Sequence, residues 1–291
     1  MAGTESAAAD TPQLIEPLDP ADAAEDAPEL HEGTVTKAQT DWQEAARLVK
    51  SAIRNGEFHL YSQAVQDLAA DVPPFHGIFV RHAEEERNMM PPGAFFELAE
   101  EYGLVSELDR WVVGDVLGWI SARMRERAGW RPSLYCITLS RDTIGDPYFP
   151  EFVQEQVAQS NVPTEALCFE FLEPDVTALA VDSAELIRNL RSYGYRTMLG
   201  GFRHDRASLK ILKEMRFDFL KIDGSLVYNL LRSEASVSKM RGIVRMAHAV
   251  GINTVAELVE SPETIAKLRE LGVDYAQGVA IADALPLHEL N

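Results

Sequence analysis

The order of apolar segments after Pro132 restricts the fold more than any other feature of the sequence. Short apolar runs alternate there with longer stretches whose apolar residues recur at helical spacing. A strict strand-then-helix order predicts parallel strands joined by crossover helices. The predicted strands are Leu134–Leu139, Leu167–Leu172, Arg196–Leu199, Phe217–Ile222, Thr254–Glu257 and Tyr275–Gln277.

The stretches between these strands have the start and stop signals of helices. Gly194, Gly251 and Gly272 each lie just beyond one of them, where a helix commonly ends in a left-handed residue. The predicted helices are Phe149–Ser160, Ser183–Tyr193, Asp205–Met215, Ser236–Val250 and Pro262–Leu271.

The first part of the folded region departs from this order. Two predicted strands, Phe58–Leu68 and Gly77–Arg81, are separated only by a Pro-containing turn, so we expect them to be antiparallel. Helices are predicted for Ala38–Asn55, from about Pro92 and for Ser106–Ala128. The whole pattern predicts an α/β fold: a modified TIM-type (β/α)8 barrel with an antiparallel early strand and an extra N-terminal helix.

Charge divides the 291-residue chain into two parts. Residues 1–36 contain nine acidic residues and no Lys or Arg, which predicts a disordered acidic tail ahead of a barrel domain at 37–291. The formal net charge of −19 disfavours nucleic acids and anionic membrane surfaces as partners. No signal peptide or membrane-spanning run is apparent, so the cytoplasm is expected. Cys136 and Cys168 lie in apolar strands and are interpreted as core residues.

Six blocks of the sequence resemble, in order and spacing, the EAL family of bacterial signalling domains. Among them are Lys221-Ile222-Asp223 and the Gln277-Gly278 pair. The resemblance implies a TIM-type barrel, whose catalytic members hydrolyse cyclic di-GMP with two divalent cations. The blocks are Phe58–Leu68, Pro92–Leu104, Leu108–Val113, Phe217–Asp223, Val255–Glu260 and Gly272–Gly278.

Several oxygen ligands of the catalytic members have no counterpart here. The family pattern has Asn at the end of the third strand, an Asp-Asp pair at the end of the fifth and Glu at the start of its Glu-Ala-Leu motif. We align these positions with Thr138, Gly200-Gly201 and Ile78. Since divalent cations need clustered oxygen ligands, the resemblance implies that hydrolysis is lost, with no catalytic residues, metal or cofactor.

Other polar positions of the family pattern are retained. The resemblance implies that they form a cyclic di-GMP site, with Arg81 suited to a phosphate and Gln63 and Gln277 near the bases. Without metals, Lys221 either faces a ligand phosphate or pairs with Glu170 or Glu257 inside the barrel. The candidate residues are Gln63, Arg81, Glu170, Lys221, Asp223, Glu257 and Gln277.

Three functions remain open at this point. We favour a cyclic di-GMP receptor without hydrolysis over a protein–protein interaction module that has lost the messenger, and place a weakly active phosphodiesterase third. A protein partner is expected in either of the first two cases, and homodimer formation is left open. The basic loop with Arg203, His204 and Arg206 is either a solvated turn with Asp205 as helix cap or a rebuilt partner surface.

Overall fold

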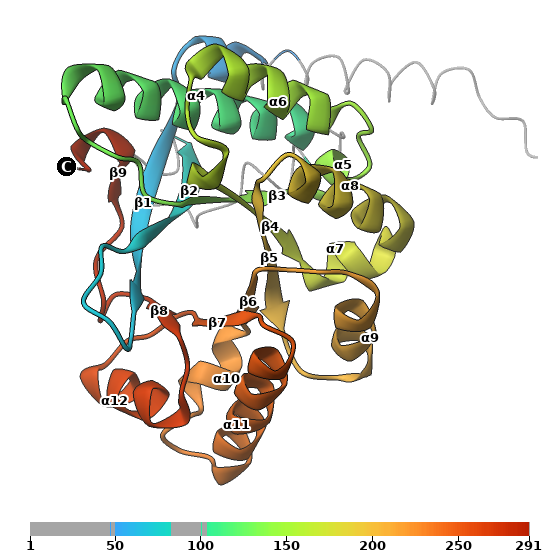
Figure 1. The fold of residues 1–291 in the computed structure, drawn as a ribbon, viewed down its shortest axis with the longest axis vertical. Coiled ribbons are helices and arrows are strands. Elements are labelled where there is room, and N and C mark those ends of the chain that lie inside the picture. The colour runs from blue at the N-terminus through green and yellow to red at the C-terminus, as the bar shows by residue number, and fades with distance from the viewer. Residues whose placement is uncertain (1–46, 48–49, 83–99, 101–103, 291) are drawn as a thin grey trace, which may run out of the picture. The chain divides into compact units, whose positions relative to one another are not determined.

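The computed structural model describes residues 47, 50–82, 100 and 104–290. Eight of its strands close into a barrel in the order β2-β3-β4-β5-β6-β7-β8-β1, with β1 paired back to β2, and β9 extends the sheet from β1. Figure 1 shows the strands as a ring with helices around it. The strands are β1 Phe58–Asp67, β2 Phe75–His82, β3 Tyr135–Leu139, β4 Leu167–Leu172, β5 Arg196–Phe202, β6 Phe219–Ile222, β7 Asn253–Ala256, β8 Tyr275–Gln277 and β9 Leu285–Pro286.

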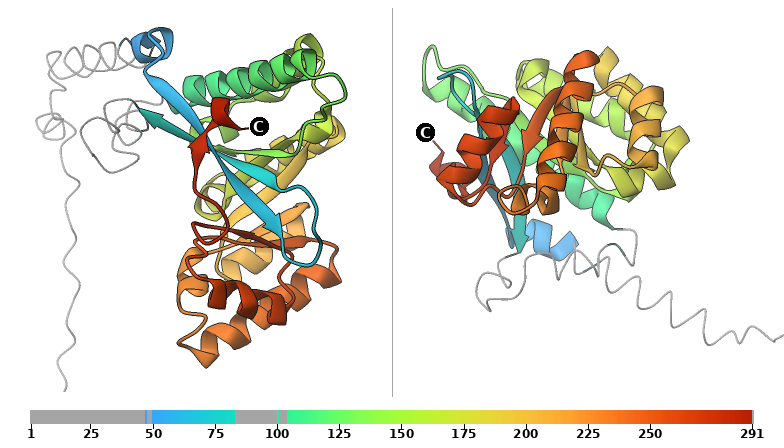
Figure 2. Two further views of the ribbon diagram at one scale, coloured as in Figure 1. Left: turned by 90° about the vertical axis from the view of Figure 1, so that its left-hand side faces the viewer. Right: turned by 90° about the horizontal axis from the view of Figure 1, so that it is seen from below.

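The predicted antiparallel start is confirmed and closes the barrel. β1 pairs antiparallel with β2, with Leu60 opposite Val80, and also with β8, with Val65 opposite Gln277. The remaining neighbours from β2 to β8 are parallel. β1 also pairs with β9 near the C-terminus, and Figure 2 shows this short strand lying beside the long β1–β2 hairpin.

The helices that follow the parallel strands lie within a few residues of their predicted ends. Short helices after β3, β4 and β6 were not expected, because a single turn carries no readable apolar period. The helices are α4 Val105–Glu126, α5 Arg141–Ile144, α6 Phe149–Ser160, α7 Glu173–Ala178, α8 Ala180–Ser192, α9 Arg206–Glu214, α10 Gly224–Tyr228, α11 Glu234–Ala249 and α12 Pro262–Leu271.

Local caps agree with the sequence signals. Gly194, Gly251 and Gly272 have φ of 94°, 74° and 78°, as expected for left-handed residues after helices. Asp205 caps α9: its carboxylate accepts hydrogen bonds from the backbone N–H groups of Ala207 and Ser208. The solvated-turn interpretation of this loop therefore has a structural basis.

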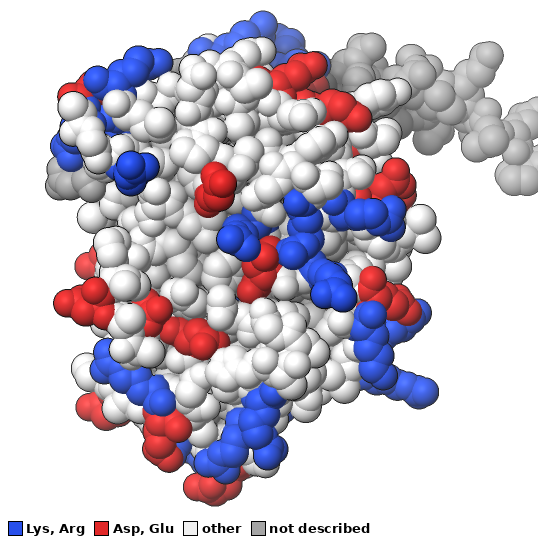
Figure 3. Space-filling model, in the orientation of Figure 1, with Lys and Arg blue, Asp and Glu red and all other residues white. Residues whose placement is uncertain are grey.

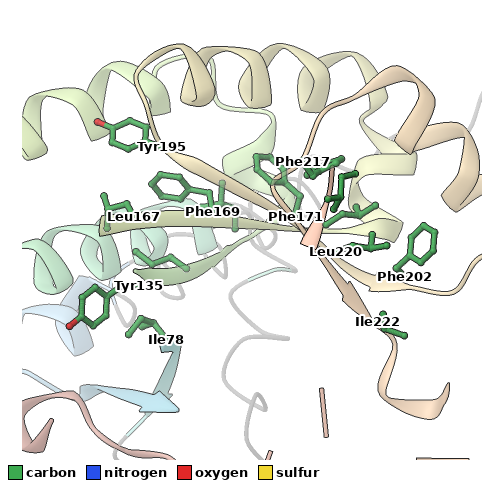
Figure 4. Close-up of a cluster of buried hydrophobic side chains, with 14 of the residues drawn as sticks. Ile78, Tyr135, Leu167, Phe169, Phe171, Tyr195, Phe202, Phe217, Leu220 and Ile222 are labelled. Atoms are coloured by element: carbon green, nitrogen blue, oxygen red, sulfur yellow. The ribbon is translucent and has the colours of Figure 1, made fainter. Parts of the chain in front are cut away.

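Most of the core lies between the strands and the helices. Figure 4 shows part of this layer, in which Tyr135 and Phe169 are completely enclosed beside Ile78. Phe169 makes edge-on contacts with Phe149 of α6 and Tyr195, so aromatic packing joins β4 to its neighbours.

Several expectations fall on residues outside the described part of the chain. They are the acidic tail at 1–36, the helix from Pro92 and all but the last turns of the helix at Ala38–Asn55, of which Arg47 and Lys50–Arg54 are helical. None of the described helices is long and apolar enough to cross a bilayer. On the face in Figure 3, basic and acidic side chains are interspersed, so no single sign of charge covers it.

Asp109 on α4 ties this helix to the end of β3. Its Oδ2 accepts hydrogen bonds from the backbone N–H of Ser140 at 2.9 Å, from the Ser140 hydroxyl at 2.7 Å and from the Thr143 hydroxyl at 2.6 Å. Burial raises the pKa of Asp109 to about 6, even though these hydrogen bonds oppose the shift and only the Asp142 charge adds to it.

We expect Asp109 to make stability fall as pH rises from about 4 to about 6. In this range the folded protein holds a proton on Asp109 that the unfolded chain has released, so raising the pH favours unfolding, by about 2–3 kcal/mol over the window. Asp109→Asn removes this titration. Urea unfolding at pH 4 and pH 6 measures the difference in unfolding free energy between wild type and variant. The same difference at both pH values contradicts the expectation.

Two glycines should respond to alanine in opposite directions. A Cβ on Gly278, whose φ is 156°, would overlap the backbone O and N atoms of Val259, whereas a Cβ on Gly114 in α4 meets nothing within 4 Å. Gly278→Ala should cost about 1–3 kcal/mol or more, and Gly114→Ala should stabilise by up to about 1 kcal/mol through helix propensity. Chemical denaturation measures both, and equal effects would contradict the assigned geometry.

Candidate functional site

Strand alternation divides the barrel interior into layers. The lower layer is an apolar cluster that includes Phe75, Cys136, Cys168 and Met198, so these side chains point inward. Two residues further along each parallel strand, and two residues earlier on the antiparallel β1, side chains point inward again at the end of the barrel where TIM-barrel active sites are built. This upper layer, the barrel mouth, consists of Gln63, Gly77, Thr138, Glu170, Gly200, Lys221, Glu257 and Gln277.

This layering corrects one sequence assignment. Ile78 belongs to the outer core between strands and helices, so it does not occupy a ligand position. The inward residue of β2 is Gly77, one position earlier, and it too lacks an oxygen-bearing side chain. Counting in steps of two from the inward Phe75 identifies it, but the sequence alone did not show which face of this strand is inward.

A buried ion pair occupies the mouth. Lys221 Nζ lies 2.6 Å from Glu170 Oε2, and both residues are buried. The Thr138 hydroxyl donates to the same carboxylate oxygen at 3.3 Å. Burial acts to lower the pKa of Lys221, but Glu170, with a smaller contribution from Glu257, outweighs it and raises that pKa. Lys221 is therefore a bound ammonium ion, as one of the two sequence alternatives expected.

Glu257 directly follows β7, within electrostatic reach of this pair. Its Oε1 accepts a hydrogen bond from the backbone N–H of Gly224 at 3.1 Å. Burial raises its pKa, while the Lys221 charge acts in the opposite direction. Glu257 thus braces the start of α10 and adds a second acidic group close to Lys221.

Both glutamines lie close to Gly77. Gln63 is opposite Gly77 in the β1–β2 register, and its Nε2 donates to the Ala282 carbonyl at 3.0 Å. Gln277 is buried, and its Nε2 has no hydrogen-bond partner among the described residues. An unsatisfied buried donor is unusual in a folded protein and commonly marks a group that meets a ligand or water.

Arg81 and Asp223 have other neighbours. Arg81 is partly exposed, and its guanidinium lies over the Tyr61 ring at 5.3 Å from the centroid. Asp223 caps α10, bonds the Ser225 hydroxyl and accepts from Arg203 Nε at 3.2 Å. Although burial raises the pKa of Asp223, these hydrogen bonds outweigh it, so that pKa is lowered.

Sequence reasoning anticipated that Glu173 braces a loop but missed the Arg203–Asp223 link and the conformation of Leu258. Arg203 is linked to the mouth through Asp223, and Glu173 Oε2 accepts from the Ser208 hydroxyl at 2.7 Å and the Arg203 N–H at 3.4 Å. Leu258 has a φ of 54° and is 62 % exposed, where the family motif has Gly. The Leu-for-Gly difference in the motif was the available signal for Leu258.

The loops after β7 and β8 are bonded to each other next to Leu258. The Val259 N–H donates to the Gln277 carbonyl, and the Ala280 N–H donates to the Val259 carbonyl, both at 3.0 Å. Since Gly278 packs on the Val259 backbone, these two loops form one rim of the mouth.

The mouth does not fit a pair of divalent cations. Such ions need several oxygen ligands each, but Gly77, Gly200 and Gly201 offer no side-chain oxygen, and the Glu170 carboxylate already binds an ammonium. Among the described residues, no group of three His, Cys, Asp or Glu side chains is placed to hold a metal.

Comparison with known proteins shows the family to which this barrel belongs. Residues 46–284 match the model of the EAL domain. The chain belongs to the EAL domain family. It is 30% identical over 240 residues to cyclic di-GMP phosphodiesterase PdeB of Shewanella oneidensis, covering 82% of this chain and 28% of that protein. It is 28% identical over 239 residues to cyclic di-GMP phosphodiesterase PdeF of Escherichia coli (strain K12), covering 82% of this chain and 31% of that protein.

A solved EAL domain has the same fold. The FimX EAL domain of Xanthomonas citri, crystallised in complex with c-diGMP, superposes with a TM-score of 0.77 at 26% identity, covering 89% of this chain and 99% of that one. The chain thus matches the whole of one EAL domain but under a third of the two curated phosphodiesterases.

The buried pair gives a stability prediction for this EAL domain. Lys221→Ala leaves the Glu170 carboxylate buried without a counter-ion, which should cost about 3–5 kcal/mol in unfolding free energy. Lys210→Ala, at an exposed lysine of α9, is the control and should change stability little. Urea denaturation compares them. Equal effects of the two variants would mean that the Lys221–Glu170 ion pair is not formed in solution.

Proposed function

We propose that this EAL domain is a receptor that binds cyclic di-GMP without hydrolysing it. The observation that carries the proposal is the buried Nε2 of Gln277, which has no hydrogen-bond partner among the described residues and lies in the same layer as the Lys221 ammonium. Cyclic di-GMP has two phosphodiester groups, so a fixed ammonium is a suitable partner for it. The proposed site residues are Gln63, Arg81, Glu170, Lys221, Asp223, Glu257 and Gln277.

The roles of these side chains follow from their chemistry. Lys221 and Arg81 supply positive charge for the phosphodiesters, and the partly exposed Arg81 fork can donate two hydrogen bonds to one phosphate. The unpartnered Nε2 of Gln277 supplies a donor for a guanine or phosphate oxygen. Glu170 and Glu257 hold Lys221 and the start of α10 in place.

Both the relatives and the donor set bear on hydrolysis. PdeB and PdeF are named phosphodiesterases, whereas the FimX EAL domain was crystallised in complex with c-diGMP. Removing even one charge-stabilising group costs an enzyme about 10²-fold or more in rate. Gly77, Thr138, Gly200 and Gly201 lie at four such positions, which supports binding as the remaining role.

Calorimetric titration tests binding. We expect cyclic di-GMP to bind without added metal, and Arg81→Ala to weaken binding by about 10–100-fold, because a charge-assisted hydrogen bond contributes about 1.5–3 kcal/mol. Arg188→Ala, at an exposed arginine on α8, is the matched control and should bind as the wild type does. Absence of heat with the wild-type protein would favour an interaction module instead.

Incubation with Mg²⁺ or Mn²⁺ tests hydrolysis separately. We expect cyclic di-GMP to remain intact, since the mouth cannot assemble the ligands of two cations. Chromatography detects the linear product pGpG. Its accumulation at a rate that scales with protein concentration, and that disappears in Glu170→Gln, would establish an active phosphodiesterase and refute this part of the proposal.

A further inference from the structure

Gly200 and Gly201 are adjacent, and glycine suits each position for a different structural reason. Gly201 has a φ of 69°, so its backbone favours glycine, but a Cβ there would meet nothing within 4 Å. Gly200 is not one of the glycines with a positive φ in the described chain, so its backbone does not require glycine. A Cβ on Gly200 would instead overlap Glu170 Oε1 at 2.3 Å and lie 3.1 Å from both Glu170 Cδ and Leu172 Cδ2. The Glu170 carboxylate therefore occupies the space that a side chain at position 200 would need.

Gly77 shows the same relation on the other side of the barrel. A Cβ on Gly77 would lie 2.5 Å from Gln277 Nε2. At two positions where the strands point into the mouth without a side chain, a longer neighbour has filled the space. Glu170 and Gln277 thus fill the space that ligand side chains at positions 200 and 77 would need.

We propose that Gly200 and Glu170 are positioning residues that together hold the Lys221 ammonium as the resident cation of the mouth. Glu170 can lean toward β5 because residue 200 is glycine, and from that position its other oxygen, Oε2, binds Lys221 at 2.6 Å. Thr138 fixes the same oxygen from β3. A side chain at position 200 and this placement of Glu170 exclude each other.

The inference deepens the proposed function, because an ammonium held in this way is the cation that the mouth offers to a phosphodiester. It also explains why restoring one acid would not rebuild a metal site: an Asp at position 200 has to displace the carboxylate that binds Lys221. The inference itself concerns the free protein and can be tested with no ligand present.

The test uses a ¹H–¹⁵N spectrum selective for lysine ammonium groups. Most lysines exchange their ammonium protons too fast to be observed, but a buried, paired ammonium exchanges slowly. We expect one protected signal, assigned to Lys221 by its loss in Lys221→Arg. Gly200→Ala should abolish or shift it, and Gly114→Ala, which adds the same methyl group in open space, should keep it.

A rescue variant separates positioning from general damage. Glu170→Asp shortens the side chain by one methylene, so in the Gly200→Ala background its carboxylate should clear the new methyl group and restore the signal at least in part. Because Gly200→Ala itself risks misfolding, Glu170→Gln provides a second route: it keeps the side-chain size, removes the charge, and should also lose the signal while the fold is retained by circular dichroism.

Cyclic di-GMP affinity supplies a separate readout. Gly200→Ala should weaken it about tenfold, with partial recovery in the Gly200→Ala/Glu170→Asp double variant. An unchanged ammonium signal in Gly200→Ala, or a lost signal that Glu170→Asp does not recover, overturns the inference. Absence of cyclic di-GMP binding by the wild-type protein overturns the proposed function alone, since the spectrum is recorded without ligand.

Discussion

The buried contact between Lys221 and Glu170 is the interaction on which the rest of the site depends. Each charge alone would be expensive inside the barrel, so each requires the other. Their pairing fixes two strands, β4 and β6, at the height where the mouth opens. Thr138 and Glu257 are arranged around this pair, and the free donor of Gln277 lies in the same layer.

The barrel has kept its architecture while its polar interior has changed. The lower inward layer is apolar, with Cys136, Cys168 and Met198 packed among aromatic side chains, and needs no ligand to be stable. The upper layer is where the family builds its chemistry, and it consists here of one ion pair, a second glutamate, a threonine, two amides and two glycines. Fold and chemistry are separable in this way because they occupy different layers of the same strands.

Much of the fold followed from the sequence, because strand-then-helix order and glycine caps are local signals. β4, β8, α6 and α12 have the predicted bounds. Ile78 shows the limit: strand alternation predicts that neighbours point to opposite faces, but it does not say which face is inward. The sequence also could not predict that Glu170 fills the space beside Gly200, because the direction of a side chain depends on packing between strands far apart in sequence.

Leu258 adds a mechanical consequence. A leucine in the left-handed region stores about 1–3 kcal/mol of conformational strain, which persists only while its surroundings hold it. Here the restraint is the pair of backbone hydrogen bonds that connects Val259 with the loop after β8. If either loop moves away, these hydrogen bonds break and the restraint on Leu258 is lost. The loops after β7 and β8 should therefore open together. A partner that binds one of these loops would therefore also move the other.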